Sequence, residues 1–317
     1  MPKYGRLRTV IEAWCLHVFS IRVVLLQIDF VFLPIIKFRT MKKILTMLFL
    51  ALMVCEVVVA NDPMEIKVIS YNIRTIARDG DNNWENRQHA TRNMLNRHNP
   101  DLFGLQEAMK PHLKYLDKFF PQYSRVGVGR DDGKMAGEVM AIYYNTERFD
   151  LIDSGTFWLS ETPDKVSKGW DAACNRTVTW VKVRDKESRK RFYYFNTHLD
   201  HRGRVAQTES IKLIVEKIKE IAGPRATVIL GGDFNVVPED EIFAPLNEFM
   251  YAARTTAAVT EDKGTFNGFN KQRQRSVIDH VFYRGRRVKC SEYHVLDGDY
   301  GAPYISDHYP VEVVLTF

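Results

Sequence analysis

A short glycine-bounded turn constrains this chain more than any other stretch. Residues 226–230 (Ala-Thr-Val-Ile-Leu) are apolar and β-branched, which is typical of a buried strand, and Gly231-Gly232-Asp233-Phe234-Asn235 follows directly. Two glycines suit a strand end where backbones approach closely or where φ is positive. Asp233 and Asn235 project to one side of an extended chain, at the strand end where open α/β sheets bind ligands. A turn in which both residues only cap the next element explains the pentapeptide equally well.

Polar residues also follow other apolar strands of the chain. The strands predicted at 65–71, 102–106 and 192–197 end at Asn72, Glu107 and His198. Two later sites are similar, namely Asp279 in Ser-Val-Ile-Asp-His and the pair Asp307-His308. Each alone could be a cap, a turn or a satisfied structural side chain, but a series of them indicates a shared site. The set offers Asn, Glu, Asp and His and no cysteine, which suits Mg²⁺, Mn²⁺ or Ca²⁺ better than structural zinc.

The remaining pattern predicts one α/β domain with many strands. Helical spacing is found around 86–98, 111–120, 203–221 and 239–249. Further strands are predicted at 123–128, 138–145, 150–158, 177–183, 277–283, 288–296 and 311–317. The segment 159–175 is predicted to be a polar loop.

The net charge of +6 is concentrated at the N-terminus. Residues 1–60 hold eight Lys/Arg and three Asp/Glu, so 37 basic and 36 acidic residues remain in 61–317. A folded region so close to neutrality gives little support for a polyanionic partner.

The N-terminal region has the layout of a secretory signal peptide. Met41-Lys42-Lys43 is a short basic start, Ile44 to Val54 is apolar, and Val58 to Ala60 supplies small residues before a cleavage site. We therefore expect a signal peptide at 41–60 and an exported catalytic domain at 61–317, periplasmic or secreted. Residues 1–40 are interpreted as a non-native upstream extension in preference to a membrane anchor. Cys174 and Cys290 are expected to be free thiols, although export permits a disulfide.

Six motifs together resemble the endonuclease/exonuclease/phosphatase superfamily, which has the deoxyribonuclease-I-like fold. In chain order they are Ser70-Tyr71-Asn72, Leu105-Gln106-Glu107, Asn196-Thr197-His198-Leu199-Asp200, Gly231-Gly232-Asp233-Phe234-Asn235, Ile278-Asp279-His280 and Ser306-Asp307-His308-Tyr309-Pro310. The resemblance covers nearly all of 61–317 and suggests an exported bacterial member. It implies a four-layer α/β sandwich, with two packed mixed β-sheets flanked by helices.

The resemblance also implies roles for the polar residues. Glu107 is expected to be the principal Mg²⁺ ligand, with Asn72 and Asp307 close by and Mn²⁺ as an alternative ion. Asp233 would activate the attacking water, and Asn235 would hold a phosphate oxygen. His308 would contact the phosphate and would be oriented by Asp279. His198 would act near the leaving group and would be oriented by Glu138. Arg176 would be a further phosphate contact.

The substrate class is left open by the resemblance, since the superfamily cleaves nucleic acids, phospholipid head groups and sugar or inositol phosphates. The loop 159–175, with Trp170, and the segment 270–275, with Lys271, Arg273 and Arg275, are expected to flank the cleft. We expect a metal-dependent phosphoester hydrolase, monomeric and without an obligate protein partner. The alternatives are a nuclease specific for DNA or RNA and a non-catalytic binding module, although the latter should have lost site residues. No Gly-x-Ser-x-Gly elbow supports a serine hydrolase.

Overall fold

The computed structural model describes residues 45–47, 63–270, 272 and 275–317. Most of the predicted signal peptide, the upstream extension, Lys271 and Arg273 lie outside these residues. Within the described part of the chain, no helix combines the length and the apolar character needed to cross a bilayer.

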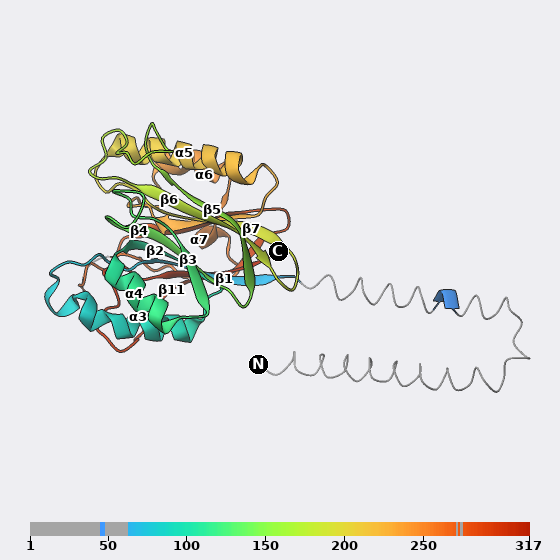
Figure 1. The fold of residues 1–317 in the computed structure, drawn as a ribbon, viewed down its shortest axis with the longest axis horizontal. Helices are drawn as coiled ribbons and strands as arrows, with labels where there is room; N and C mark the ends of the chain where they lie inside the picture. Colours follow the sequence, from blue (N-terminus) through green and yellow to red (C-terminus); the bar gives the residue numbers. More distant parts are fainter. Residues whose placement is uncertain (1–44, 48–62, 271, 273–274) are drawn as a thin grey trace, which may run out of the picture. The chain divides into compact units, whose positions relative to one another are not determined.

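Two mixed six-stranded sheets form the centre of residues 63–317 (Figure 1). The first has the order β11-β12-β1-β2-β4-β3 and the second β5-β6-β7-β8-β10-β9. Each sheet contains one parallel pair, β1 with β2 and β7 with β8. The strands are β1 Glu65–Asn72, β2 Leu102–Ala108, β3 Tyr123–Val126, β4 Val139–Asn145, β5 Phe149–Trp158, β6 Thr177–Asp185, β7 Arg191–His198, β8 Val228–Asp233, β9 Tyr251–Ala252, β10 Asp279–Arg284, β11 Lys289–Val295 and β12 Val311–Thr316.

Helices cover the outer faces of both sheets, which completes the four-layer sandwich expected from the sequence (Figure 1). Helices α3 (Trp84–His98) and α4 (Lys110–Phe119) pack with the first sheet, and α5 (Arg204–Ala222) and α6 (Ala244–Asn247) pack with the second. The apolar stripe of α5 is buried at Ile211, Ile214 and Ile218, as its spacing predicts. Shorter elements are α7 (Ala253–Thr256) and the 3-10 turns η1 (Gly80–Asn82) and η2 (Glu241–Phe243).

The two sheets pack face to face around a core that includes Val68, Val313, Ile229 and Tyr194. Tyr194 points between the sheets, and a Cβ placed on Gly231 would lie 3.0 Å from its hydroxyl oxygen. A Cβ on Gly232 would collide with the carbonyl oxygen of Thr197 on the neighbouring strand. Of the two explanations for the paired glycines, close approach therefore applies.

The predicted elements differ from the structure mainly in short segments. The helix expected near 239–249 is divided into η2 and α6, and Pro245 stands in the first turn of α6. A proline has no N–H to continue a preceding helix, so a break before it is expected. Strand β10 begins at Asp279, two residues later than predicted. Cys174 and Cys290 are both free, and Cys290 is buried whereas Cys174 is half-buried.

Candidate active site

Strand register brings the polar residues of the second sheet side by side. His198 on β7 lies opposite Asp233 on the parallel strand β8. Asp279, the first residue of β10, lies opposite Asp233 on the other side. In the first sheet, Asn72 at the end of β1 pairs with Gln106, the neighbour of Glu107. The strand ends that the sequence marked as polar thus meet at one edge of the sandwich.

Asp233 lies at the centre of this group and is 1% exposed. Asn72 Nδ2 donates to Asp233 Oδ2 at 2.9 Å and to Glu107 Oε1 at 3.1 Å, which links the two sheets. The ring nitrogens Nε2 of His198 and His308 lie 3.5 Å and 3.7 Å from the same Asp233 oxygen. Burial raises the pKa of Asp233, although His308 opposes the rise. A carboxylate of higher basicity accepts a proton from water more readily.

His308 is fixed by Asp279 in a buried ion pair. Its Nδ1 lies 2.9 Å from Asp279 Oδ2, and both side chains are almost fully buried. Burial lowers the pKa of His308, but Asp279 and Asp233 outweigh this and raise it to about 10. The imidazolium form therefore leaves Nε2–H free to donate beside Asp233.

His198 has the opposite electrostatic character. Burial, followed by the positive charge of Arg176, lowers its pKa well below the usual range. Asn235 Nδ2 donates to His198 Nε2 at 3.0 Å and to the carbonyl of Leu199 at 3.1 Å. With this orientation of the Asn235 amide, Nε2 is the acceptor, and Nδ1 has no hydrogen-bond partner among the described residues.

Glu138, expected to orient His198, lies immediately before β4 and has another partner. Its Oε2 accepts from Arg130 Nη1 at 2.6 Å and is 4.0 Å from His198 Nδ1. Burial raises the pKa of Glu138, and Arg130 opposes the rise. The contact with His198 is therefore a long one.

The residues expected to hold a metal ion offer a suitable set of donors. Glu107 adopts a left-handed φ of 58° within an irregularity of β2, and its Oε2 accepts from the backbone N–H of Thr75 at 2.8 Å. Burial raises the pKa of Asp307, with His308 and Arg74 opposing and Glu107 adding to the rise. The two carboxylates thus repel each other, and a divalent cation bound by oxygen donors would relieve that repulsion. Glu107 and Asp307 therefore fit a hard cation. Asn72 faces Glu107 with Nδ2 while its Oδ1 accepts from the backbone N–H of Arg74 at 3.0 Å, so its amide would have to turn to add an oxygen ligand.

A second group could also hold an ion, since atoms of Asp233, Asp279 and His308 all lie within 4.8 Å of one another. In that group, however, His308 Nδ1 and Asp279 Oδ2 are already paired. A protonated imidazole is not a metal ligand. We therefore favour the set around Glu107.

Arg176 and Trp170 lie outside the group centred on Asp233. Arg176 is buried, pairs with Asp200 at 3.5 Å and contacts His201 Nδ1 at 3.0 Å, and its charge contributes to the lowered pKa of His198. Its Nη1 is buried and has no hydrogen-bond partner among the described residues. Trp170, in the loop 159–175, has a left-handed φ of 47° and a backbone N–H facing Glu161. Among the described residues, its ring makes no ring–ring or cation–π contact with the site residues.

Two charged residues near the site were not anticipated. Arg74 has a left-handed φ of 61°, and its Nη1 lies 3.5 Å from Asp307 Oδ2. Its position two residues after Asn72 was the available signal. Arg130 precedes Glu138 by eight residues in an irregular loop, and nothing in the local pattern indicates their pairing.

Comparison with known proteins identifies the family. Residues 69–308 match the model of the endonuclease/exonuclease/phosphatase family. A family protein from Bacteroides thetaiotaomicron is 37% identical, with a TM-score of 0.76 over 81% of this chain and 99% of that one. The mannosyl-6-phosphatase of Bacteroides thetaiotaomicron is also 37% identical, with a TM-score of 0.73 over 80% of this chain and 100% of that one. An uncharacterised Acanthamoeba polyphaga mimivirus protein is 28% identical over 73% of this chain and 91% of its own length. This chain therefore belongs to the endonuclease/exonuclease/phosphatase family.

Proposed function

We propose that this protein is a metal-dependent phosphomonoesterase that acts on a sugar phosphate. The observation that carries the proposal is the position of Asp233, whose buried carboxylate contacts Asn72 and adjoins both His198 and His308. This arrangement suits attack on phosphorus by a water molecule that Asp233 deprotonates. Family membership supports phosphoester hydrolysis as the reaction class.

The protein's own groups divide the chemical work. Asp233 accepts the proton of the attacking water, because burial raises its basicity. His308 donates from Nε2 to a phosphate oxygen, where negative charge must be stabilised. Asn235 lies beside His198 and can turn its amide toward a second phosphate oxygen.

A metal ion would bind at Glu107, Asn72 and Asp307. Mg²⁺ is the ion we propose, with Mn²⁺ as a substitute, since the two carboxylates offer hard oxygens and Asn72 would add a third once its amide turns. A bound divalent cation would supply neutralisation of the phosphate charge.

His198 accepts a hydrogen bond in the free protein. Its lowered pKa makes the imidazolium form scarce at neutral pH, which disfavours protonation of the leaving group. We therefore propose that His198 orders Asn235 and the leaving-group side of the site. The resemblance implied action near the leaving group, and the lowered pKa argues against proton transfer as that action.

Charge around the site supports a small substrate over a long nucleic acid. The loops 129–138 and 159–175 contain both basic and acidic residues. The basic ones are Arg130, Lys134, Lys165 and Lys168, and the acidic ones are Asp131, Asp132, Glu138, Glu161, Asp164 and Asp171. Phosphate neutralisation by unpaired cations dominates affinity for nucleic acids. The 37% identical mannosyl-6-phosphatase points in the same direction.

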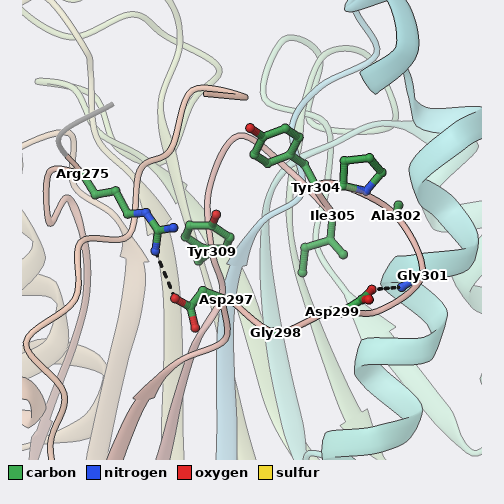
Figure 2. Close-up of a pocket in the computed structure, with 10 residues that line it drawn as sticks. Arg275, Asp297, Gly298, Asp299, Gly301, Ala302, Tyr304, Ile305 and Tyr309 are labelled. Carbon is green, nitrogen blue, oxygen red and sulfur yellow. Dashed lines mark hydrogen bonds and ion pairs between the residues drawn. The ribbon is translucent and has the colours of Figure 1, made fainter. Parts of the chain in front are cut away.

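A cavity of about 560 Å³ is lined in part by Ile305 and Tyr309, which flank Asp307 and His308 in the sequence. Figure 2 shows Tyr304 and Ile305 on its lining loop, with Arg275 on the opposite side. Arg275 Nη1 bonds to Asp297 at 3.0 Å and its guanidinium covers the ring of Tyr309, so its charge is already engaged. A cavity lined by aromatic rings, by the Arg275–Asp297 pair and by Asp299 suits an uncharged, hydroxylated group. We propose that it accommodates the sugar.

A panel of phosphoesters tests the function. Mannose 6-phosphate, glycerol 3-phosphate, phosphocholine, RNA, and single-stranded and duplex DNA should be assayed with Mg²⁺, with Mn²⁺ and with EDTA. We expect fastest phosphate release from the sugar phosphate, its loss with EDTA, and no turnover by Asp233→Asn. Tyr304→Ala should raise KM for mannose 6-phosphate more than for glycerol 3-phosphate. Faster cleavage of nucleic acid, or full activity in EDTA, would overturn the proposal.

A further inference from the structure

Arg87 is a fully buried arginine beneath the candidate metal site. It lies on α3 and is 1% exposed, yet no carboxylate among the described residues is close enough to form an ion pair with it. Trp84 and Phe269 flank its guanidinium, each with a ring centroid at 5.8 Å. A buried cation without a directly paired carboxylate is costly, and the charges of Asp307 and Asp79 act on Arg87 only from beyond ion-pair distance.

All the hydrogen bonds of Arg87 go to backbone carbonyls. Its Nε donates to Asn82 at 2.6 Å, and its Nη2 is 3.5 Å from the carbonyl oxygen of Arg74. Its Nη1 donates both to Ile73 at 3.0 Å and to Ile305 at 2.6 Å. One guanidinium therefore holds two chain segments that are more than 220 residues apart.

These segments carry the candidate metal ligands. Ile73 follows Asn72 directly, and Ile305 lies two residues before Asp307. Ser306, between them in space, donates through its hydroxyl to the carbonyl of Asn72 at 2.7 Å. The guanidinium also contacts the carbonyl of Arg74. The backbone of Arg74 is in the left-handed region, which residues other than glycine rarely adopt. Arg87 therefore joins the segment after Asn72 to the segment before Asp307, together with the Ser306 hydroxyl.

We infer that Arg87 is a positioning residue that sets the affinity of the site for its divalent cation. It acts by fixing the backbone that carries Asn72 to the backbone that carries Asp307. The inference rests on the metal site proposed above. Only a planar fork of donors reaches these carbonyls together, because a lysine ammonium is a single point at the end of its chain.

Arg97 provides a matched control. It lies on the same helix, is exposed, and donates from Nη1 at 3.0 Å to the carbonyl of Asp299, in the same loop as Ile305. It therefore makes the same type of bond without joining the two ligand segments. Changes shared by Arg87 and Arg97 variants would reflect general loosening of the loop.

The experiment measures Mn²⁺ binding by electron paramagnetic resonance, independently of turnover. Arg87→Lys should weaken Mn²⁺ binding by about 10-fold or more, the range found when groups that orient metal ligands are removed. Arg97→Lys should change it less than about 2-fold. Thermal melting and circular dichroism establish that each variant is folded. A structural role alone would lower the melting temperature and leave the Mn²⁺ Kd unchanged.

A second variant covers the case in which Arg87→Lys does not fold. Tyr71 Oη donates to the same Ile305 carbonyl at 2.8 Å, so Tyr71→Phe removes one anchor without removing a charge. It should weaken Mn²⁺ binding in the same direction. If Arg87→Lys folds and has the wild-type Kd for Mn²⁺, the inference is wrong while the proposed metal site stands. If Arg87→Lys does not fold, a wild-type Kd for Tyr71→Phe has the same meaning. Absence of Mn²⁺ binding to the wild-type protein overturns the proposed metal site, and the inference with it.

Discussion

His308 and Asp279 form a buried ion pair, with Nδ1 of the ring 2.9 Å from Oδ2 of the carboxylate. The pair joins the first residue of β10 to the segment that leads into β12. The backbone N–H of Asp279 in turn donates to Thr265 Oγ1 at 3.1 Å. The ring is therefore held with Nε2 directed toward Asp233. We propose that the reacting phosphate binds beside these two groups.

Asp279→Asn should separate charge from shape at this pair. The amide can still accept a hydrogen bond from Nδ1, but it no longer favours the imidazolium form of His308. We expect kcat to fall by about 10²-fold, the usual loss when one preorganised donor is weakened. Steady-state kinetics on a phosphomonoester provide the measurement. Asp262→Asn, at a fully exposed carboxylate, is the control, and equal kcat values for both variants would contradict the role of Asp279.

Glu107→Gln should affect the metal before it affects the fold. Glutamine keeps the shape and the bond from Thr75 N–H but removes the charge that holds a cation. We predict that the Mg²⁺ concentration for half-maximal activity rises by at least about 10-fold, while the melting temperature without metal is maintained. Titration of activity with Mg²⁺ measures the first quantity. Unchanged metal dependence at normal turnover would mean that Glu107 is not a ligand.

Leaving-group dependence should distinguish the role of His198. A histidine that protonates the departing oxygen matters most for a basic alkoxide and little for p-nitrophenolate. Because burial lowers the pKa of His198, we expect His198→Ala to reduce kcat by similar factors with a sugar phosphate and with p-nitrophenyl phosphate. A much larger loss with the sugar phosphate would restore the proton-transfer role. His308→Ala, as the comparison, should harm both substrates.

The sequence located the strand ends of the site but not the pairing of their side chains. Apolar runs that end in Asn72, His198 and Asp233 are visible locally, because burial and strand period act over a few residues. The bond between Asn72 and Asp233 joins residues 161 apart and depends on how two separate sheets pack. The sandwich itself was implied by the resemblance of the ordered motifs to the family, and it is confirmed.

The charged groups around the site were the hardest to foresee. Arg130 Nη1 donates to Glu138 Oε2 at 2.6 Å, whereas His198 Nδ1 is 4.0 Å from the same oxygen. The position of Arg130 depends on an irregular loop. Arg87 lies in the segment 86–98 that was predicted to be helical, and an arginine in such a helix is expected on the exposed side, yet Arg87 is buried. Its burial is possible only because carbonyls from distant segments surround it.

Gly232→Ala should destabilise the protein through a clash in the second sheet. A Cβ at this position would meet the carbonyl oxygen of Thr197 and lie 2.9 Å from its Cγ2. Overpacking of this kind typically costs about 1–3 kcal/mol. Gly298→Ala is the control, because its nearest neighbour would be at 3.4 Å. Urea denaturation measures both, and equal midpoints would show that β7 and β8 can separate without penalty.

His112 should make the folded protein sensitive to acid. His112 is buried at the start of α4, where Nδ1 accepts from the backbone N–H of Met109 at 2.9 Å and the ring packs edge-on against Trp84. Burial, with the nearby charge of Arg87, lowers its pKa from the ordinary 6.5 to about 3. The unfolded chain therefore binds a proton that the folded chain refuses, so stability from this group is complete above pH 6.5 and is lost as the pH falls toward 3.

At pH 5 this loss amounts to about 2 kcal/mol. His112→Gln removes the titration, and glutamine at this third helical position can still accept from the N-cap N–H. We expect the free energy of unfolding to fall less between pH 7.5 and pH 5 for His112→Gln than for the wild type. His89→Gln, at an exposed histidine of α3, controls for loss of a histidine as such. Parallel pH curves for His112→Gln and the wild type, measured by urea denaturation, would show that the folded protein admits the proton, because relaxation of α4 would then solvate the ring.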